Sequence, residues 1–192
     1  MNKFNSIKNR ILFSVLVLFP IAMQAQETSE ASVEQSIFGI QAGRLGVWGY
    51  NESKLTNTIA LRSEIGFEIT NVYLFNITQG NELFIPLVLV IEPRYYFDLK
   101  KLNSKGLSIE NNAASFFSLK IRYHAGWLML SGKQPSNLQI IPTFASRTNI
   151  GKNFNFEIGG GMGYQYIFTS NLKEEEKDFW AFNLVLRIGY LF

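Results

Sequence analysis

The stretch FWAFNLVLRIGYLF, residues 179–192, decides the fold class of this chain. Its even-numbered positions from Trp180 to Phe192 are all large and apolar, whereas its odd-numbered positions include Asn183, Arg187 and Gly189. A repeat of two residues is that of side chains along a β-strand. An apolar face with aromatic residues at both ends is typical of a strand that faces lipid, because aromatic rings favour the membrane interfaces. The segment therefore predicts the closing strand of an outer-membrane β-barrel.

The N-terminus predicts export from the cytoplasm. Residues 1–10 carry Lys3, Lys8 and Arg10 and no acidic residue, residues 11–23 are almost continuously apolar, and Ala25 is the expected last residue removed. This order is typical of a secretory signal peptide, and the apolar run is shorter than the ~20 residues of a spanning helix. We predict a signal peptide over residues 1–25, a mobile leader over residues 26–35 and a barrel over residues 36–192.

Charge and cysteine content exclude several classes of function. Removal of residues 1–25 takes away three of the 18 Lys and Arg residues and leaves 15 against 15 acidic residues, so the mature chain is neutral. A nucleic-acid-binding protein would need a basic face, which the mature sequence does not offer. The absence of Cys excludes disulfides, thiolate metal sites, cysteine nucleophiles and lipid attachment at a Cys after the signal peptide.

Alternation like that of residues 179–192 recurs along the chain. It predicts strands over residues 37–50, 57–69, 83–98, 116–130, 138–148 and 154–168, with a glycine-associated bulge near Leu45 and a polar turn over residues 51–54. Bacterial barrels usually have an even number of strands, so an eighth is expected over residues 72–77 or before Ile37. We therefore predict an all-β fold, a transmembrane antiparallel up-and-down barrel of eight strands. Such a barrel is just wide enough for side chains to fill its lumen.

A soluble β-sandwich is the main alternative, since its half-buried strands alternate equally well. Two features favour the membrane barrel. The polar faces carry mainly Gly, Ser, Asn and a few charges, and the predicted strands exceed the usual 5–6 residues and suit a tilted crossing of ~9–11 residues.

Charged residues recur on the polar face of the predicted strands. In a barrel this face lines the lumen, where we expect a charge network formed by Arg62, Glu64, Glu92, Arg94, Lys120, Arg122, Arg147, Glu157 and Arg187. Buried charges are tolerable when they are paired, and Arg can bind a carboxylate through two hydrogen bonds. The simplest interpretation is an ion-pair network that fills the barrel. The alternative is a selectivity ring in a narrow pore.

An enzymatic alternative rests on His124, the only histidine. A lipid-modifying serine hydrolase would place a Ser and an acid beside it. Ser118 shares its strand and face, but six residues along a strand span ~20 Å, so the two side chains cannot meet. A zinc site would need further ligands that one His without Cys does not provide. We expect no catalytic residue, no metal and no cofactor.

Aromatic residues near the predicted strand ends indicate membrane girdles, in which amphipathic rings lie at the interfaces. The expected members are Trp48, Tyr50, Tyr95, Trp127, Tyr164, Tyr166, Trp180 and Tyr190.

Several segments together resemble a family of small Gram-negative outer-membrane β-barrel proteins, the porin-like domain group. They are FGIQAG (38–43) with YNE (50–52), IALRSEIG (59–66), EPRYYF (92–97), SLKIRYH (118–124) and LRIGYLF (186–192). The resemblance implies insertion by the barrel assembly machinery, with Phe192 as the terminal aromatic assembly signal.

The functional expectation is a non-enzymatic barrel with a side-chain-filled lumen and a structural or surface-interaction role. It would be a monomer in the cell outer membrane, with outer-membrane lipids and the assembly machinery as partners. The alternatives are a narrow passive channel and, ranked lower, a lipid-modifying enzyme.

Overall fold

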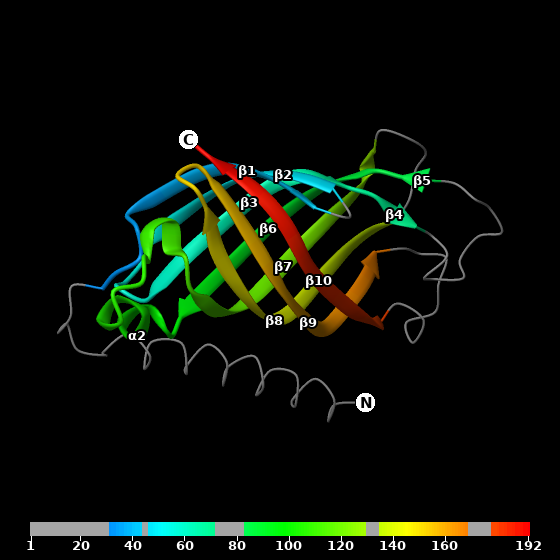
Figure 1. The fold of residues 1–192 in the computed structure, drawn as a ribbon. Helices are drawn as coiled ribbons and strands as arrows, with labels where there is room; N and C mark the ends of the chain where they lie inside the picture. Colours follow the sequence, from blue (N-terminus) through cyan, green and yellow to red (C-terminus); the bar gives the residue numbers. More distant parts are fainter. Residues whose placement is uncertain (1–30, 44–45, 72–82, 130–134, 169–177) are drawn as a thin grey trace, which may run out of the picture. The chain divides into compact units, whose positions relative to one another are not determined.

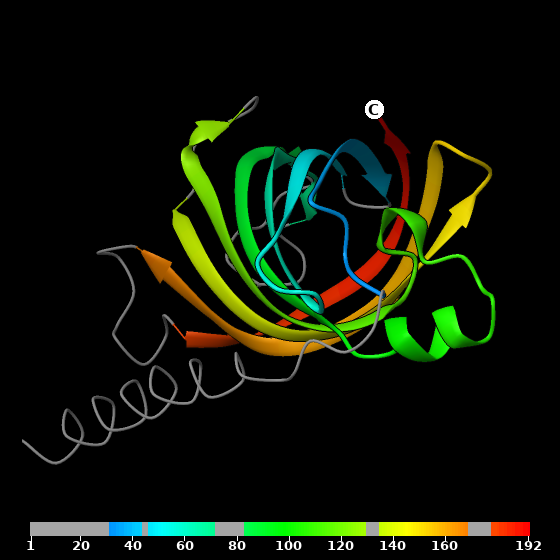
Figure 2. The same ribbon diagram turned by 90° about the vertical axis from the view of Figure 1, so that its left-hand side faces the viewer.

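Eight antiparallel strands close into a barrel in the computed structural model, which describes residues 31–43, 46–71, 83–129, 135–168 and 178–192 (Figures 1 and 2). Around the barrel the strand order is β1-β10-β9-β8-β7-β6-β3-β2. The strands are β1 (Ser36–Gly43), β2 (Gly46–Lys54), β3 (Ile59–Glu68), β6 (Pro86–Tyr96), β7 (Ser115–Met129), β8 (Ser136–Ile150), β9 (Phe154–Phe168) and β10 (Asp178–Leu191). A separate short pair, β4 (Thr70–Asn71) and β5 (Leu83–Phe84), extends the hairpin of β3 and β6.

The prediction of eight strands is confirmed, as is the pairing of the last strand with the first. β10 runs antiparallel to β1 from Gly39↔Leu191 to Gly43↔Arg187. This contact closes the barrel, although β1 covers only residues 187–191 of β10.

The predicted strand over residues 37–50 is wrong in one respect, because it is two strands. Gly43 pairs with Gly46, so β1 and β2 form a hairpin around residues 44 and 45, and residues 51–54 continue β2. Gly43 and Gly46, two of the glycines that suggested a bulge, flank this connection, and a Cβ atom on Gly46 would lie 2.0 Å from the Phe67 carbonyl oxygen of β3. The eighth strand therefore comes from this division. The other candidate, residues 72–77, lies outside the described residues.

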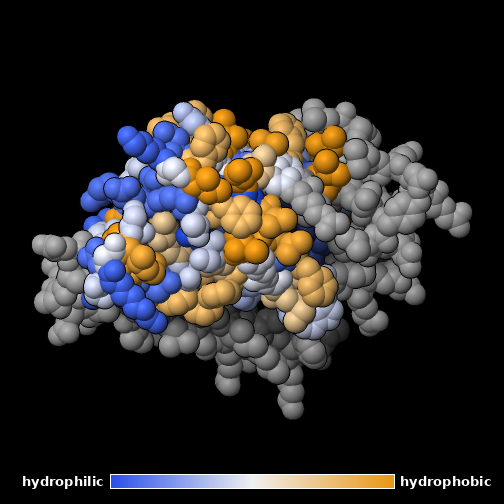
Figure 3. Space-filling model, in the orientation of Figure 1, coloured by the Kyte–Doolittle hydropathy of each residue, from blue (hydrophilic) through white to orange (hydrophobic). Residues whose placement is uncertain are grey.

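The two faces of the barrel wall have opposite chemistry. The outer positions carry large apolar side chains, among them Phe182, Leu184 and Ile188, which are exposed. Figure 3 shows apolar residues gathered over the strands and hydrophilic residues toward the end that carries α2 (Leu99–Ser104). The inner positions are dominated by buried Arg, Glu, Asn and Gln side chains.

One end of the barrel is closed by the chain itself. Here, at what we call the terminal end, lie residues 31–35, the turns at residues 55–58 and 151–153, and the connection over residues 97–114, which contains α2 and the short helix η3 (Glu110–Asn112). An apolar cluster fills this end, formed by Val33, Ala60, Tyr96, Leu99, Ala114, Phe116 and Ala145. Among the described residues, no helix has the length and hydropathy to cross a membrane.

Residues 31–35 differ from the mobile leader that the sequence predicted. Ala31 and Val33 are buried, the Val33 N–H donates to the Asn57 carbonyl at 2.9 Å, and the Glu34 N–H donates to Asn112 Oδ1 at 2.7 Å. The polar composition of this segment concealed two small apolar side chains that the end of the barrel can bury.

Candidate functional site

The candidate site is the charged interior of the barrel. All nine residues of the predicted charge network are buried there: Arg62, Glu64, Glu92, Arg94, Lys120, Arg122, Arg147, Glu157 and Arg187. Strand alternation turns them inward, while the residues on either side of each, most of them apolar, turn outward. The network also contains Glu52 and Glu68, which are not among the predicted residues.

Glu157 of β9 is the centre of the network toward the terminal end. Its carboxylate accepts hydrogen bonds from Arg147 Nε at 2.7 Å and Arg94 Nη1 at 3.0 Å, and it lies 3.4 Å from Arg62 Nη1. These three arginines come from β8, β6 and β3. A single carboxylate thus connects strands from opposite parts of the wall.

Glu52 of β2 forms a second centre next to it. It accepts from Arg147 Nη2 at 2.7 Å and Arg94 Nη1 at 3.4 Å. Its other oxygen accepts from the Tyr96 hydroxyl at 2.5 Å and from Asn112 Nδ2 at 2.6 Å. Every lone pair region of this buried carboxylate is therefore engaged, which is the condition for tolerating it away from water.

The network continues into the middle of the barrel through two further carboxylates. Glu64 accepts from Arg62 Nε at 2.5 Å and from Arg187 Nη1 at 2.8 Å. Glu92 pairs with Arg94 at 3.0 Å and lies 3.5 Å from Lys120 Nζ. The pairs are therefore linked through shared arginines into one network.

Aromatic rings pack against three of the arginines inside the barrel. Arg62 lies 3.6 Å above the centre of the Tyr50 ring, Arg94 lies 4.2 Å above Phe116, and Arg187 lies 3.9 Å above Trp48. A guanidinium over an aromatic face gains cation–π attraction, which is larger where water is excluded. These rings fill the lumen space between the ion pairs.

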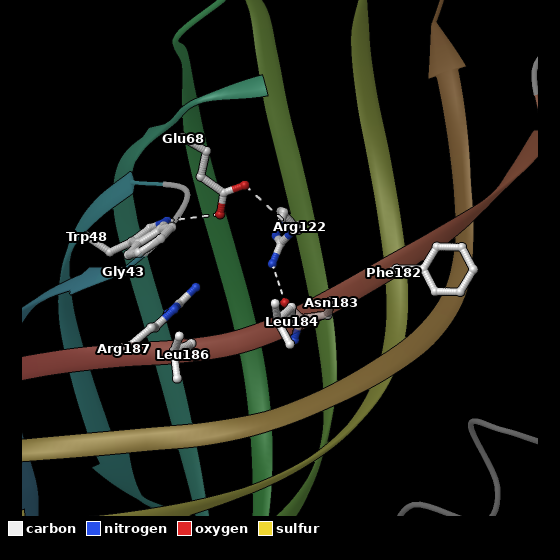
Figure 4. Close-up of a pocket in the computed structure, with 9 residues that line it drawn as sticks. All are labelled: Gly43, Trp48, Glu68, Arg122, Phe182, Asn183, Leu184, Leu186 and Arg187. Atoms are coloured by element: carbon white, nitrogen blue, oxygen red, sulfur yellow. Dashed lines mark hydrogen bonds and ion pairs between the residues drawn. The ribbon is translucent and has the colours of Figure 1, made fainter. Parts of the chain in front are cut away.

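A smaller polar group lies farther from the terminal end (Figure 4). Glu68 accepts from Trp48 Nε1 at 3.1 Å, contacts His124 Nε2 at 3.1 Å and lies 3.6 Å from Arg122 Nη1. Arg122 also donates to Asn183 Oδ1 at 2.7 Å and to Gln139 Oε1 at 3.3 Å.

The described interior carries one more positive than negative charge. Six cationic side chains are buried (Arg62, Arg94, Lys120, Arg122, Arg147, Arg187) against five carboxylates (Glu52, Glu64, Glu68, Glu92, Glu157). The near balance allows mutual pairing, and the surplus makes the interior weakly cationic.

The terminal end is attached to this network by hydrogen bonds. Arg147 Nη1 donates to the Asn111 carbonyl at 2.9 Å, and Asn112 bonds Glu52. Asn111 and Asn112 have φ angles of 56° and 57°, a region that Asn tolerates better than most residues. The connection over residues 97–114 is thereby held over the end of the lumen.

The predicted aromatic girdles are partly wrong. Trp48 and Tyr50 are buried in the lumen, because the hairpin between β1 and β2 reverses the face on which even-numbered residues lie. Tyr95, Tyr164, Trp180 and Tyr190 are exposed on the outer face, and Tyr166 is half-buried. Tyr164 and Trp180 stack with their ring centres 4.9 Å apart. The side chain of Trp127 lies outside the described residues.

His124 and Ser118 are held apart by different partners. His124 is buried with its Nδ1 atom 2.9 Å from Asn137 Oδ1 and its Nε2 atom beside Glu68, whereas the Ser118 hydroxyl donates to Glu92 Oε1 at 2.6 Å. Within the described ranges, no group of three or more His, Cys, Asp or Glu side chains is placed to hold a metal ion.

Glu52 and Glu68 were detectable in principle. Glu68 lies on the same alternating face of β3 as Arg62 and Glu64, so the alternation itself places it in the lumen. Glu52 is hidden from a prediction that places a polar turn over residues 51–54, which belong to β2. A two-residue hairpin between Gly43 and Gly46 would have placed Glu52 on the inner face.

Comparison of the chain with family models, curated proteins and solved structures gives no match.

Proposed function

We propose that this chain is a non-enzymatic integral barrel of the bacterial outer membrane, with a lumen closed by its own side chains and a structural or surface-interaction role. One observation carries the proposal: the barrel is polar inside and apolar outside. A water-soluble barrel of this size would fill its interior with apolar side chains and show charges to solvent. An apolar exterior is stable in lipid, where a closed barrel leaves no unpaired backbone edge.

The lengths of the strands support the same placement. β7, β8 and β9 each have 15 residues and β10 has 14, which exceeds the ~9–11 residues that a tilted strand needs to cross the hydrocarbon. The signal-like residues 1–25 supply the route of export. Outer-membrane lipids are then the surroundings of the wall.

Insertion by the barrel assembly machinery is part of the proposal, with Phe192 as its signal. Phe192 is 77% exposed, and its N–H donates to the Phe38 carbonyl of β1 at 3.2 Å. Its ring contributes little to the packing of the barrel and is available for recognition.

A narrow passive channel is the second candidate. The lumen has one more buried positive charge than negative charge, which favours a channel, because a cationic constriction would select anions. We rank the channel lower because ion pairs and aromatic rings that stack on arginines fill the lumen between the strands of the wall.

Single-channel recording in planar bilayers distinguishes the two candidates. We expect no stable conductance from the purified, folded full chain, because the paired side chains fill the lumen. A stable anion-selective conductance that is lost in Arg122→Ala would establish the channel and overturn the closed-lumen proposal.

A further inference from the structure

The wall of the barrel has a seam between β10 and the β1–β2 hairpin. β10 pairs with β9 over residues 178–190 but with β1 only over residues 187–191. No described residue pairs with β10 on the β1 side over residues 178–186. Around the seam, Phe182, Leu184 and Leu186 are 72%, 60% and 44% exposed on the outer face.

Backbone polar groups of β10 point into this seam. The Leu191 N–H donates to Asn153 on the β9 side, and the Phe192 N–H donates to Phe38 on the β1 side. The backbone groups of successive residues in a strand point to opposite sides, so even-numbered residues of β10 face β1, as Phe192 does. The backbone groups of Phe182 and Leu184 therefore point to the β1 side, where no described strand pairs with them. In lipid, such groups call for a polar partner.

A small cavity lies at this seam, and both lumen-facing and outward-facing side chains line it (Figure 4). On the lumen side it is lined by Trp48, Glu68, Arg122, Asn183 and Arg187, and on the outer side by Phe182, Leu184 and Leu186. Its volume is about 30 Å³, roughly twice the 10–15 Å³ that admits one water. This suits a group of the size of a carboxylate, but no sugar.

One of the cationic side chains that line the cavity has an unused hydrogen-bond donor. Arg122 Nε is buried and has no hydrogen-bond partner in the described part of the chain. Glu68 lines the cavity beside Arg122 and is also contacted by Trp48 and His124. Arg187 also lines it but is paired with Glu64 at 2.8 Å, so the side chain that lacks a partner for one donor is Arg122. A buried donor on a cation is costly unless an acceptor meets it.

We propose that this seam cavity binds a long-chain alkyl carboxylate, with its head beside Arg122 and Arg187 and its chain along Phe182, Leu184 and Leu186. The carboxylate accepts from Arg122 Nε and balances the surplus charge of the lumen. The apolar chain stays on the lipid-facing wall. The inference rests on the membrane placement proposed above, and it adds a specific ligand to that wall.

Fluorescence quenching of Trp48 tests the site. Trp48 is one of three tryptophans, so Trp127→Phe with Trp180→Phe leaves it as the only emitter. The folded full-length variant, in vesicles of phosphatidylcholine, is titrated with hexadecanoate brominated on the carbon next to the carboxylate. We expect saturable quenching, and much weaker quenching by hexadecanoate brominated at its methyl end. Equal quenching by both would indicate only general partition into the bilayer and would overturn the proposal.

Head-group variants identify the contact. Arg122→Gln should weaken the apparent affinity by roughly tenfold or more, as expected when a hydrogen bond to a charged group is lost. Arg122→Lys keeps the charge but lacks Nε, and it should also bind more weakly. Lys152→Gln removes one exposed positive charge from the β8–β9 turn and should bind as the parent does. Unchanged affinity in both Arg122 variants would contradict the proposal.

Competition distinguishes the source of the anion. Unlabelled hexadecanoate should displace the probe, whereas acetate at the same concentration should not. Displacement by acetate, or stronger displacement by hexadecyl phosphate than by hexadecanoate, would refute a carboxylate amphiphile as the ligand. Heat-dependent gel mobility of the same samples shows whether the barrel is folded in the vesicles. A folded, membrane-inserted protein without quenching refutes this inference alone, whereas a protein that does not insert refutes the proposed function.

Discussion

At the scale of single residues, the interior depends on carboxylates that several arginines share. Glu157 contacts Arg62, Arg94 and Arg147, and all four side chains are almost completely buried. Each arginine is tolerated only because a carboxylate balances it, so the cost of removing one carboxylate falls on three cations. Removing one partner of a buried ion pair is costly, even where the intact pair adds little to the free energy of folding.

Glu157→Gln should therefore destabilise the barrel by up to about 3–5 kcal/mol, the usual cost of breaking a buried ion pair, because Arg62, Arg94 and Arg147 must then share Glu52, Glu64 and Glu92. The measurement is urea unfolding of the protein in lipid vesicles, followed by gel mobility without boiling. Glu110→Gln, at an exposed position of the connection at the terminal end, is the matched control and should unfold at the parent concentration. Equal midpoints for both variants would show that Glu157 does not hold the interior together.

Residue types and faces were predictable here, but partners were not. The nine charges were assigned to the lumen because they share one parity with each other along their strands. Which arginine meets which carboxylate depends on the stagger between strands, and this is set by the whole barrel. Arg62 of β3 meeting Glu157 of β9 has no local sequence signal.

At the scale of strands, close approach of β8 and β9 requires glycine. A Cβ atom on Gly161 would lie 2.1 Å from the Pro142 carbonyl oxygen, and one on Gly163 would lie 2.1 Å from that of Ile140. Gly160, between them in the chain, faces the other way, and a Cβ there would lie 3.3 Å from the Asn183 oxygen. The glycine-rich stretch of β9 thus has one crowded face.

Gly161→Ala should lower the yield of folded barrel and destabilise it by at least about 1–3 kcal/mol, the range for overpacking. Gly160→Ala should cost much less. Both can be measured as the fraction of protein that migrates as the folded form on a gel without boiling. The opposite order of the two variants would contradict the register of β8 and β9.

The C-terminal residue belongs to the same scale, because it ends the closing strand. Phe192→Ala should reduce the amount of protein in the outer membrane several-fold while the purified variant still refolds in detergent, since the exposed ring is proposed to act in recognition rather than in packing. Phe192→Tyr keeps an aromatic end and should assemble normally. An unchanged outer-membrane yield of Phe192→Ala would refute Phe192 as the assembly signal.

The division of residues 37–50 shows where strand prediction from the sequence fails. A bulge and a two-residue hairpin both use glycines, but they differ in which face follows the turn. With a bulge, Trp48 and Tyr50 would lie on the outer face as girdle residues. With the hairpin, they lie in the lumen and stack on Arg187 and Arg62. The pairing of Gly43 with Gly46 is a contact that alternation alone does not reveal.

At the scale of the whole molecule, the barrel has its polar side chains inside and its apolar side chains outside. This inversion was predictable from the sequence, because every clear strand alternates and its polar face carries few Lys and many Gly, Asn and Arg residues. The apolar cluster that fills the terminal end was not predictable. Val33 lies in a polar segment, and it meets Leu99 and Phe116 only when the barrel is closed.

The most direct test of the proposed membrane placement is whether the mature full chain behaves as an integral outer-membrane protein. After cell fractionation, we predict that it stays in the outer-membrane pellet through extraction with urea and alkaline carbonate, and that it migrates faster on a gel when it is not boiled. An exposed apolar wall around a closed barrel requires both results. A chain found in the soluble fraction, or one whose mobility does not depend on boiling, would contradict the account.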